Sequence, residues 1–150
     1  MSEQTLEDLE TEFGREQKGP GSLSPYIADG SKASYVGFDI HPENIEALFF
    51  EGIGVPRWDS IKADSVEQQE ALYMEEYNRV MGEYPMIARA NDTFNHVAYS
   101  ADEVAVLLEE CGRILSATSD PQVTKAVQKF SIAGSKAAEE RWGLNLNPRQ

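Results

Sequence analysis

Apolar residues recur at helical spacing in two consecutive stretches near the C-terminal end of the chain. The first stretch begins at Ser100, which stands three residues before Glu103. This is the spacing of a capping box, in which each side chain accepts a hydrogen bond from the backbone N–H group of the other residue. The pattern predicts a helix whose apolar side chains fall within an arc of about 120° and face a core. These side chains belong to Val104, Leu107, Leu108, Cys111, Ile114 and Leu115.

The second stretch begins with Asp120 and Pro121. Aspartate is a good helix cap, and proline suits the first turn because its missing N–H group would have had no partner there. The small and apolar residues that follow share one face and should let a neighbouring helix approach closely. They are Val123, Val127, Phe130, Gly134 and Ala137, with Ala126 and Ala133 at the edge. We therefore predict a C-terminal helical hairpin.

The lysines of the second helix gather on its other side. Lys125, Lys129 and Lys136 fall close together on the helical wheel, with Ile132 beside them. This face is expected to point outward, either as a solvated lysine surface or as a docking stripe. Gly143 predicts the end of the helix, and the residues after it are expected to form an extended tail.

A strand pattern appears earlier, at residues 34–40, where Tyr, Val, Phe and Ile are flanked by turn residues. Residues 26–27 could extend the sheet. Residues 18–25 are rich in Gly, Pro and Ser, as is typical of a linker. We expect an acidic arm and linker at residues 1–24 and a single globular domain at residues 25–150.

A long helix is predicted from Ser65 to about Gly82, because Ser65 and Gln68 repeat the capping spacing. Its apolar face holds Val66, Tyr73, Tyr77, Val80, Met81 and Tyr84. The tyrosines predict either the edge of the core or an aromatic binding surface. After Pro85, residues 86–99 are expected to form a small hairpin or an irregular connection. The fold expected is α+β, a helix-rich single domain with a small sheet and the helical hairpin; an all-α bundle is the alternative.

Charge narrows the classes of partner. The chain has 150 residues and a net charge of −13. Residues 120–150 hold three acidic and five basic residues, and residues 1–119 hold 23 acidic and eight basic ones. This acidity argues against binding to nucleic acid or to an anionic membrane, and favours a basic protein partner. The sequence contains neither an apolar run that could span a membrane nor a secretion signal at its N-terminus, and we expect a cytoplasmic protein.

Catalytic and metal-binding signatures are weak. His41 has possible ligands beside it at Asp39 and Glu43, but no second cluster completes a metal site, and no cofactor is predicted. His96 lies near Asp92 and could act with it as a general base. Cys111 falls in the centre of an apolar stripe and is expected to be buried and unreactive.

In size and acidity the chain resembles the small acidic cytoplasmic immunity proteins of bacteria, which bind and block a toxin. The resemblance implies a non-enzymatic inhibitor of a basic toxin or nuclease. Charge places the partner-binding surface on the long helix, at Glu67, Glu75, Glu76 and Glu83, with the rings of Tyr73 and Tyr77. One alternative is a structural or assembly subunit of a phage or secretion apparatus, which would dock to its neighbours through the lysine face of the C-terminal helix or through the N-terminal arm. Another is a small enzyme centred on His96 and Asp92.

Overall fold

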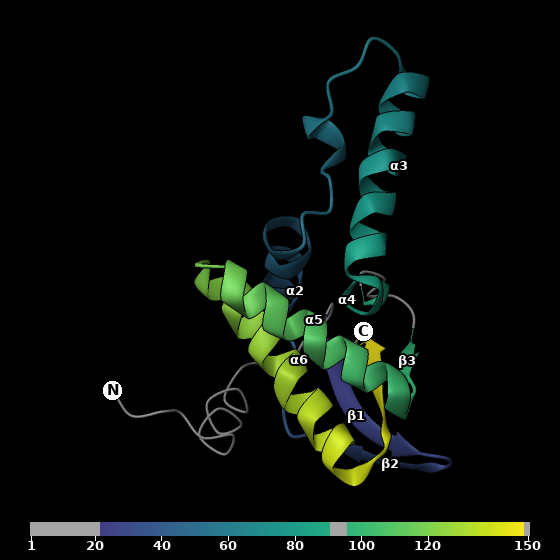
Figure 1. Ribbon diagram of the computed structural model, residues 1–150, viewed down its shortest axis with the longest axis vertical. Coiled ribbons are helices and arrows are strands. Elements are labelled where there is room, and N and C mark those ends of the chain that lie inside the picture. Colours follow the sequence, from purple (N-terminus) through teal and green to yellow (C-terminus); the bar gives the residue numbers. More distant parts are fainter. Residues whose placement is uncertain (1–21, 91–95, 149–150) are drawn as a thin grey trace.

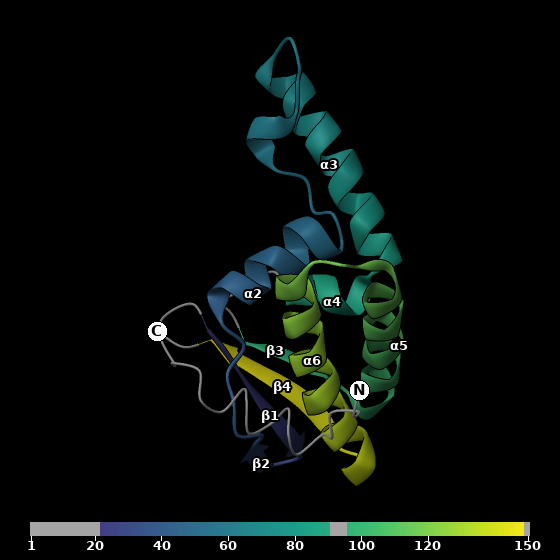
Figure 2. The ribbon, with the colours of Figure 1, turned by 90° about the vertical axis from the view of Figure 1, so that its left-hand side faces the viewer.

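The computed structural model describes residues 22–90 and 96–148, which form a helix-rich α+β fold with a four-stranded antiparallel sheet (Figure 1). This confirms the predicted fold class and excludes the all-α bundle. Figures 1 and 2 show the sheet at one end of the molecule, the paired helices α5 (Ala101–Ala117) and α6 (Pro121–Glu140) across it, and α3 (Val66–Glu83) projecting at the other end. The described residues also form three shorter helices and a 3-10 turn: α2 (Pro42–Ala47), the π-helix η1 (Leu48–Gly52), η2 (Trp58–Ser60) and α4 (Pro85–Arg89).

The sheet has the strand order β2-β1-β4-β3. The strands are β1 (Leu23–Asp29), β2 (Lys32–Tyr35), β3 (Val97–Tyr99) and β4 (Gly143–Pro148). The expected extended tail is therefore an inner strand, paired with β1 on one side and β3 on the other. Leu144 and Leu146 are both fully buried, as the two-residue period of a strand allows. β1 begins at Leu23, two residues before the expected start of the domain.

The predicted strand at residues 34–40 is only partly correct. β2 ends at Tyr35, and Gly37 then has a φ of +100°, a conformation that interrupts an extended ladder and suits glycine. The apolar residues still alternate inward, because Phe38 and Ile40 are fully buried. Ile40 exchanges two backbone hydrogen bonds with Leu23, of 3.0 and 2.7 Å. The segment is thus a core-filling connection rather than a strand.

The helical hairpin is confirmed. The Ser100 hydroxyl accepts from the Glu103 N–H group at 3.2 Å, and the Glu103 carboxylate accepts from the Ser100 N–H group at 2.9 Å. The small face of α6 does face α5: a Cβ added at Gly134 would lie 3.0 Å from the Leu108 side chain. One residue departs from the prediction, since Leu115 is 36% exposed at the end of α5.

The C-terminal end of α6 differs from the prediction. The left-handed residue is Arg141, with a φ of 60°, and the Trp142 N–H group donates to the Ala137 carbonyl at 2.8 Å. Gly143 instead begins β4. A Cβ there would lie 2.5 Å from the backbone oxygen of Tyr99, so glycine permits the close approach of β3 to β4.

The prediction that the lysine face of α6 points outward is wrong. Lys129 is fully buried and its Nζ donates to the Asp39 carbonyl at 2.8 Å, while Lys136 donates to the Val36 carbonyl at 3.3 Å. Ile132 beside them is also buried. The physical reason is that α6 packs on α5 with one side and on the chain after β2 with the other. The two carbonyls belong to that irregular segment, and lysine amines supply the donors that such buried groups require.

The connection from α3 to α5 also differs from the prediction. Residues 85–89 form α4, for which Pro85 supplies the first residue, and residues 97–99 form β3. Of the two alternatives predicted for residues 86–99, the small hairpin is therefore wrong, because β3 pairs with the distant β4. The polar turn predicted at residues 91–95, and residues 1–21 of the predicted arm and linker (residues 1–24), lie outside the described part of the chain.

Candidate functional site

Residues 56–84 form an arm, here called the α3 arm, that projects from the rest of the fold (Figures 1 and 2). The chain runs outward through η2 and returns through α3. Of the 18 residues of α3, only Val80 is buried. Among the described residues, four of the six exposed large hydrophobic side chains lie on this arm: Trp58 at 41%, Val66 at 67%, Leu72 at 38% and Met74 at 43% exposed. Packing on the core therefore does not account for the exposed apolar side chains of the arm.

A row of aromatic rings joins the two halves of the arm. The Trp58 ring meets Tyr73 edge-on at a centroid distance of 5.7 Å, and Tyr73 stacks on Tyr77 at 6.0 Å. The Gln69 amide adds a hydrogen bond of 3.0 Å to the Trp58 carbonyl. Part of the tyrosine face lies at the core edge, as predicted, because Tyr77 and Tyr84 pack against the hydrophobic core. Tyr73 packs instead against the outgoing segment, and Tyr73 and Tyr77 both remain partly exposed.

The start of α3 carries a cap that differs slightly from the predicted one. The Ser65 hydroxyl accepts from the Gln68 N–H group at 3.1 Å, as the spacing predicted. The Gln68 side chain, however, accepts from the N–H group of Asp64 at 2.8 Å, one residue before the expected partner. The first turn of α3 is therefore capped by two hydrogen bonds, both of which involve Gln68.

The four acidic residues predicted to bind a partner fall into two pairs. Arg79 bonds both Glu76 and Glu83 at 3.0 Å, and these contacts raise the pKa of its guanidinium. Glu67 and Glu75 are exposed, and neither has an ion pair with any other described residue. Glu67 and Glu75 are therefore the stronger candidates for meeting a basic partner, because the charge of the other two is already partly neutralised.

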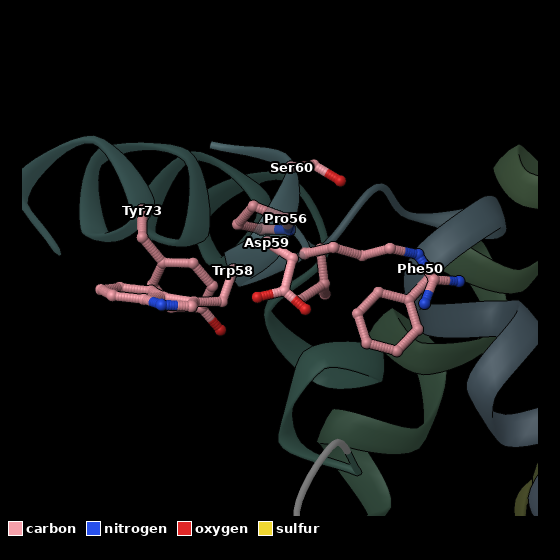
Figure 3. Close-up of a pocket in the computed structure, with 8 residues that line it drawn as sticks. Phe50, Pro56, Trp58, Asp59, Ser60 and Tyr73 are labelled. Atoms are coloured by element: carbon pink, nitrogen blue, oxygen red, sulfur yellow. The ribbon is translucent and has the colours of Figure 1, made fainter. Parts of the chain in front are cut away.

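A hollow of about 370 Å³ opens beside the aromatic row (Figure 3). Its lining residues come from η1, from the outgoing segment and from α3: Phe50, Val55, Pro56, Arg57, Trp58, Asp59, Ser60 and Tyr73. Figure 3 places the Asp59 carboxylate between the Trp58 ring and the Phe50 ring. The Arg57 guanidinium lies 4.0 Å from the Phe50 ring centroid and bonds Glu51 at 3.5 Å.

Sequence reasoning missed this hollow. Tyr73 was a predicted binding residue, but Trp58 and Asp59 lie in a segment without helical or strand period. The only available signal was a tryptophan flanked by charged residues in an irregular stretch, which predicts an exposed ring without saying what the ring faces.

The base of the arm is held by α5 at two positions one helical turn apart. The fully buried Glu110 accepts hydrogen bonds from the N–H groups of Met86 and Ile87, both at 3.0 Å, and so caps the first turn of α4. Arg113 donates to the Glu83 carbonyl at the end of α3, at 2.9 Å. An anion thus meets a helix N-terminus and a cation meets a helix C-terminus, as the helix dipoles favour. Local sequence patterns could not predict this arrangement, because the partners are 23 to 30 residues apart.

Burial raises the pKa of the Glu110 carboxyl, and the two backbone hydrogen bonds oppose that rise. Tyr99 strengthens the same junction, since its hydroxyl donates to the Met86 carbonyl at 2.7 Å. The junction between α3 and α4 is therefore fixed to the body, and the arm projects from a firm base.

Comparison with protein-family models, with curated proteins and with solved structures found no match for this chain. The candidate site accordingly rests on the geometry of the chain alone. Within residues 22–90 and 96–148, none of the helices combines the length and the hydropathy that a membrane span requires.

The residues considered as catalytic or metal-binding candidates gain no support from the described part of the chain. His41 caps α2, accepting from the Glu43 N–H group at 3.4 Å. His96 is exposed, and Asp92 lies outside the described residues, so their pairing stays a prediction. Cys111 is fully buried, as expected, and burial raises the pKa of its thiol to about 12. In the described part of the chain, no three His, Cys, Asp or Glu side chains gather closely enough to hold a metal ion.

Proposed function

We propose that the protein is a non-enzymatic protein–protein interaction module whose α3 arm docks on a basic protein, such as a toxin or nuclease that it inhibits. The observation that carries this proposal is the exposure of the arm, where a helix of 18 residues buries only Val80. Helices in globular proteins gain most of their stability by packing an apolar face. A long helix that packs so little is better explained by a surface that a partner covers.

The composition of the arm supports a basic partner. It holds seven acidic and three basic residues, within a chain whose net charge is −13. Exposed apolar side chains such as Leu72 and Met74 would supply the dry centre of an interface, and the acidic residues around them would guide a basic partner and set its orientation. Inhibition would follow from occlusion of the partner's basic surface. We also propose that this activity takes place in the cytoplasm.

The test is a charge reversal on the arm. The variant Glu67→Lys with Glu75→Lys should release a basic protein that co-purifies with the wild-type chain at about 50 mM salt, and about 500 mM salt should release it from the wild type too. The matched control is Glu139→Lys with Glu140→Lys, because these exposed residues at the end of α6 give the same change of charge away from the arm. Retention of the partner by the arm variant, at the level of the control, would refute the proposal.

Neither alternative function gains an observation from the structure. The assembly subunit was to dock through the lysine face, which is largely turned inward, with Lys129 buried. Its other proposed contact, the N-terminal arm, and half of the His96–Asp92 pair lie outside the described residues. Both remain proposals without further support.

A further inference from the structure

The hollow beside the aromatic row combines aromatic surface with a carboxylate. Trp58 and Tyr73 form one wall, and Figure 3 shows the Asp59 carboxylate next to them and directed into the open space. Asp59 is exposed and forms no ion pair with another described residue. The cationic neighbour Arg57 is directed instead to Phe50 and Glu51. A negative charge is therefore left open beside two aromatic rings.

This combination selects for a cation. The faces of tryptophan and tyrosine rings attract positive charge, and a carboxylate next to them adds an ion pair. Arginine suits the site better than lysine, because its flat guanidinium can stack on a ring while bonding a carboxylate with two N–H groups, and it is less strongly hydrated. The same hollow already contains one such stack, that of Arg57 on Phe50 at 4.0 Å.

We infer that this hollow receives an arginine side chain of a basic protein partner, held between the Trp58–Tyr73 wall and the Asp59 carboxylate. The inference rests on the proposed function and names its contact. The volume of about 370 Å³ lies at the small end of the range of ligand sites, roughly 300–1,000 Å³, which suits one long side chain. The charge of the chain, −13, favours the approach of an arginine-bearing surface from solution.

The experiment uses the full chain and a short fluorescent Gly/Ser/Lys peptide with a single arginine at its centre. A second peptide carries neutral citrulline, of the same shape, at that position. We expect the arginine peptide to bind about threefold to tenfold more tightly at low salt, measured by fluorescence anisotropy. It should also shift the NMR signal of the Trp58 indole N–H group, which is identified by its absence in Trp58→Ala. The citrulline peptide should leave that signal in place.

Two variants test the contacts separately. Asp59→Asn keeps the shape of the site and should abolish most of the preference for arginine, and Trp58→Ala should do the same by removing the ring. The matched control is Glu139→Gln, which also removes one exposed negative charge, and it should retain the full preference. Because Asp59 is exposed and outside the aromatic row, circular dichroism of Asp59→Asn should show an unchanged fold, and this variant decides the test where Trp58→Ala also loosens the arm.

The outcomes separate this inference from the proposed function. Salt-sensitive binding of both peptides with equal affinity, lost on reversing Glu67 and Glu75, would refute the arginine site and support the basic-partner function. A preference for arginine that needs Asp59 and Trp58 but ignores the reversal of Glu67 and Glu75 would support the site and refute the broader acidic surface. Failure of both peptides to bind at low salt would overturn both.

Discussion

Replacement of Glu110 should destabilise the protein by removing the link between α5 and the base of the arm. Its carboxylate accepts hydrogen bonds from two backbone N–H groups, those of Met86 and Ile87. A hydrogen bond to a charged group contributes about 1.5–3 kcal/mol, and a buried donor left unpaired costs about 1–3 kcal/mol. Glu110→Gln keeps the volume but turns an amide donor toward one of the two N–H groups, and should cost about 2 kcal/mol. Glu110→Ala leaves both donors unpaired beside a cavity, and should cost about 3–5 kcal/mol.

Urea unfolding at pH 7, followed by circular dichroism, measures both values. The control is Glu109→Gln, because Glu109 is an exposed neighbour whose ion pair with Arg113 at 2.9 Å is a surface contact worth about 0.5 kcal/mol. If Glu110→Ala cost no more than Glu109→Gln, the claim that α5 fixes the base of the arm through this carboxylate would fail.

The difference in stability between the wild type and Glu110→Gln should depend on pH, and the direction of that dependence can be predicted. Burial raises the folded-state pKa of Glu110 above its unfolded value of about 4.5. The stability linked to this raised pKa is fully present below the unfolded value and is lost as the pH rises through the folded value. Glutamine does not titrate, so the deficit of Glu110→Gln relative to wild type should shrink as the pH rises above about 4.5. A deficit that grew over this range would show that the hydrogen bonds outweigh burial.

Two further pairs of variants test the core. Lys129→Ala should lower the free energy of unfolding in urea by about 2–4 kcal/mol, because Lys129 is buried and donates to a backbone carbonyl. The control Lys62→Ala, at an exposed lysine, should change it by less than about 0.5 kcal/mol. Equal effects would contradict the buried position of Lys129. Gly143→Ala places a methyl group 2.5 Å from the backbone oxygen of Tyr99 and should cost about 3 kcal/mol by parting two strands. Gly112→Ala, with open space around it in α5, should instead stabilise the protein by about 0.5–1 kcal/mol. Thermal melts measure both variants, and melting temperatures that shifted in the same direction would contradict the close approach of β3 to β4.

The helical hairpin could be predicted because its signals are local. Ser100, Glu103 and Asp120 act within one turn of the residues that they cap, and small residues such as Gly134 mark a close helix contact on their own. The orientation of Lys129 could not be predicted in this way. A helical wheel shows which residues share a face, but α6 is covered on two sides, and the second cover is an irregular segment more than 80 residues earlier.

The sheet was harder to predict than the helices because its pairings are long-range. Two leucines in six residues are too few to predict β4 as a strand. β4 forms because it pairs with residues 23–28 and residues 97–99, which are both distant from it in the sequence. Of the candidate site, sequence patterns supplied the helix, its acidic residues and its tyrosines. They could not supply Trp58 or Asp59, because an irregular segment has no period from which to infer the direction of a side chain.

The geometry of the arm bears on how a partner would bind. Its base is fixed by α5, and its outgoing segment is fixed to α3 by the Trp58–Tyr73–Tyr77 row and by the Gln69 amide. A surface held in this way loses little conformational entropy on binding, which favours affinity. Trp58 therefore has two roles that one truncation cannot separate, since it braces the arm and also lines the hollow. Asp59→Asn separates them: it leaves the aromatic row intact, so any loss of arginine preference in that variant belongs to the site itself.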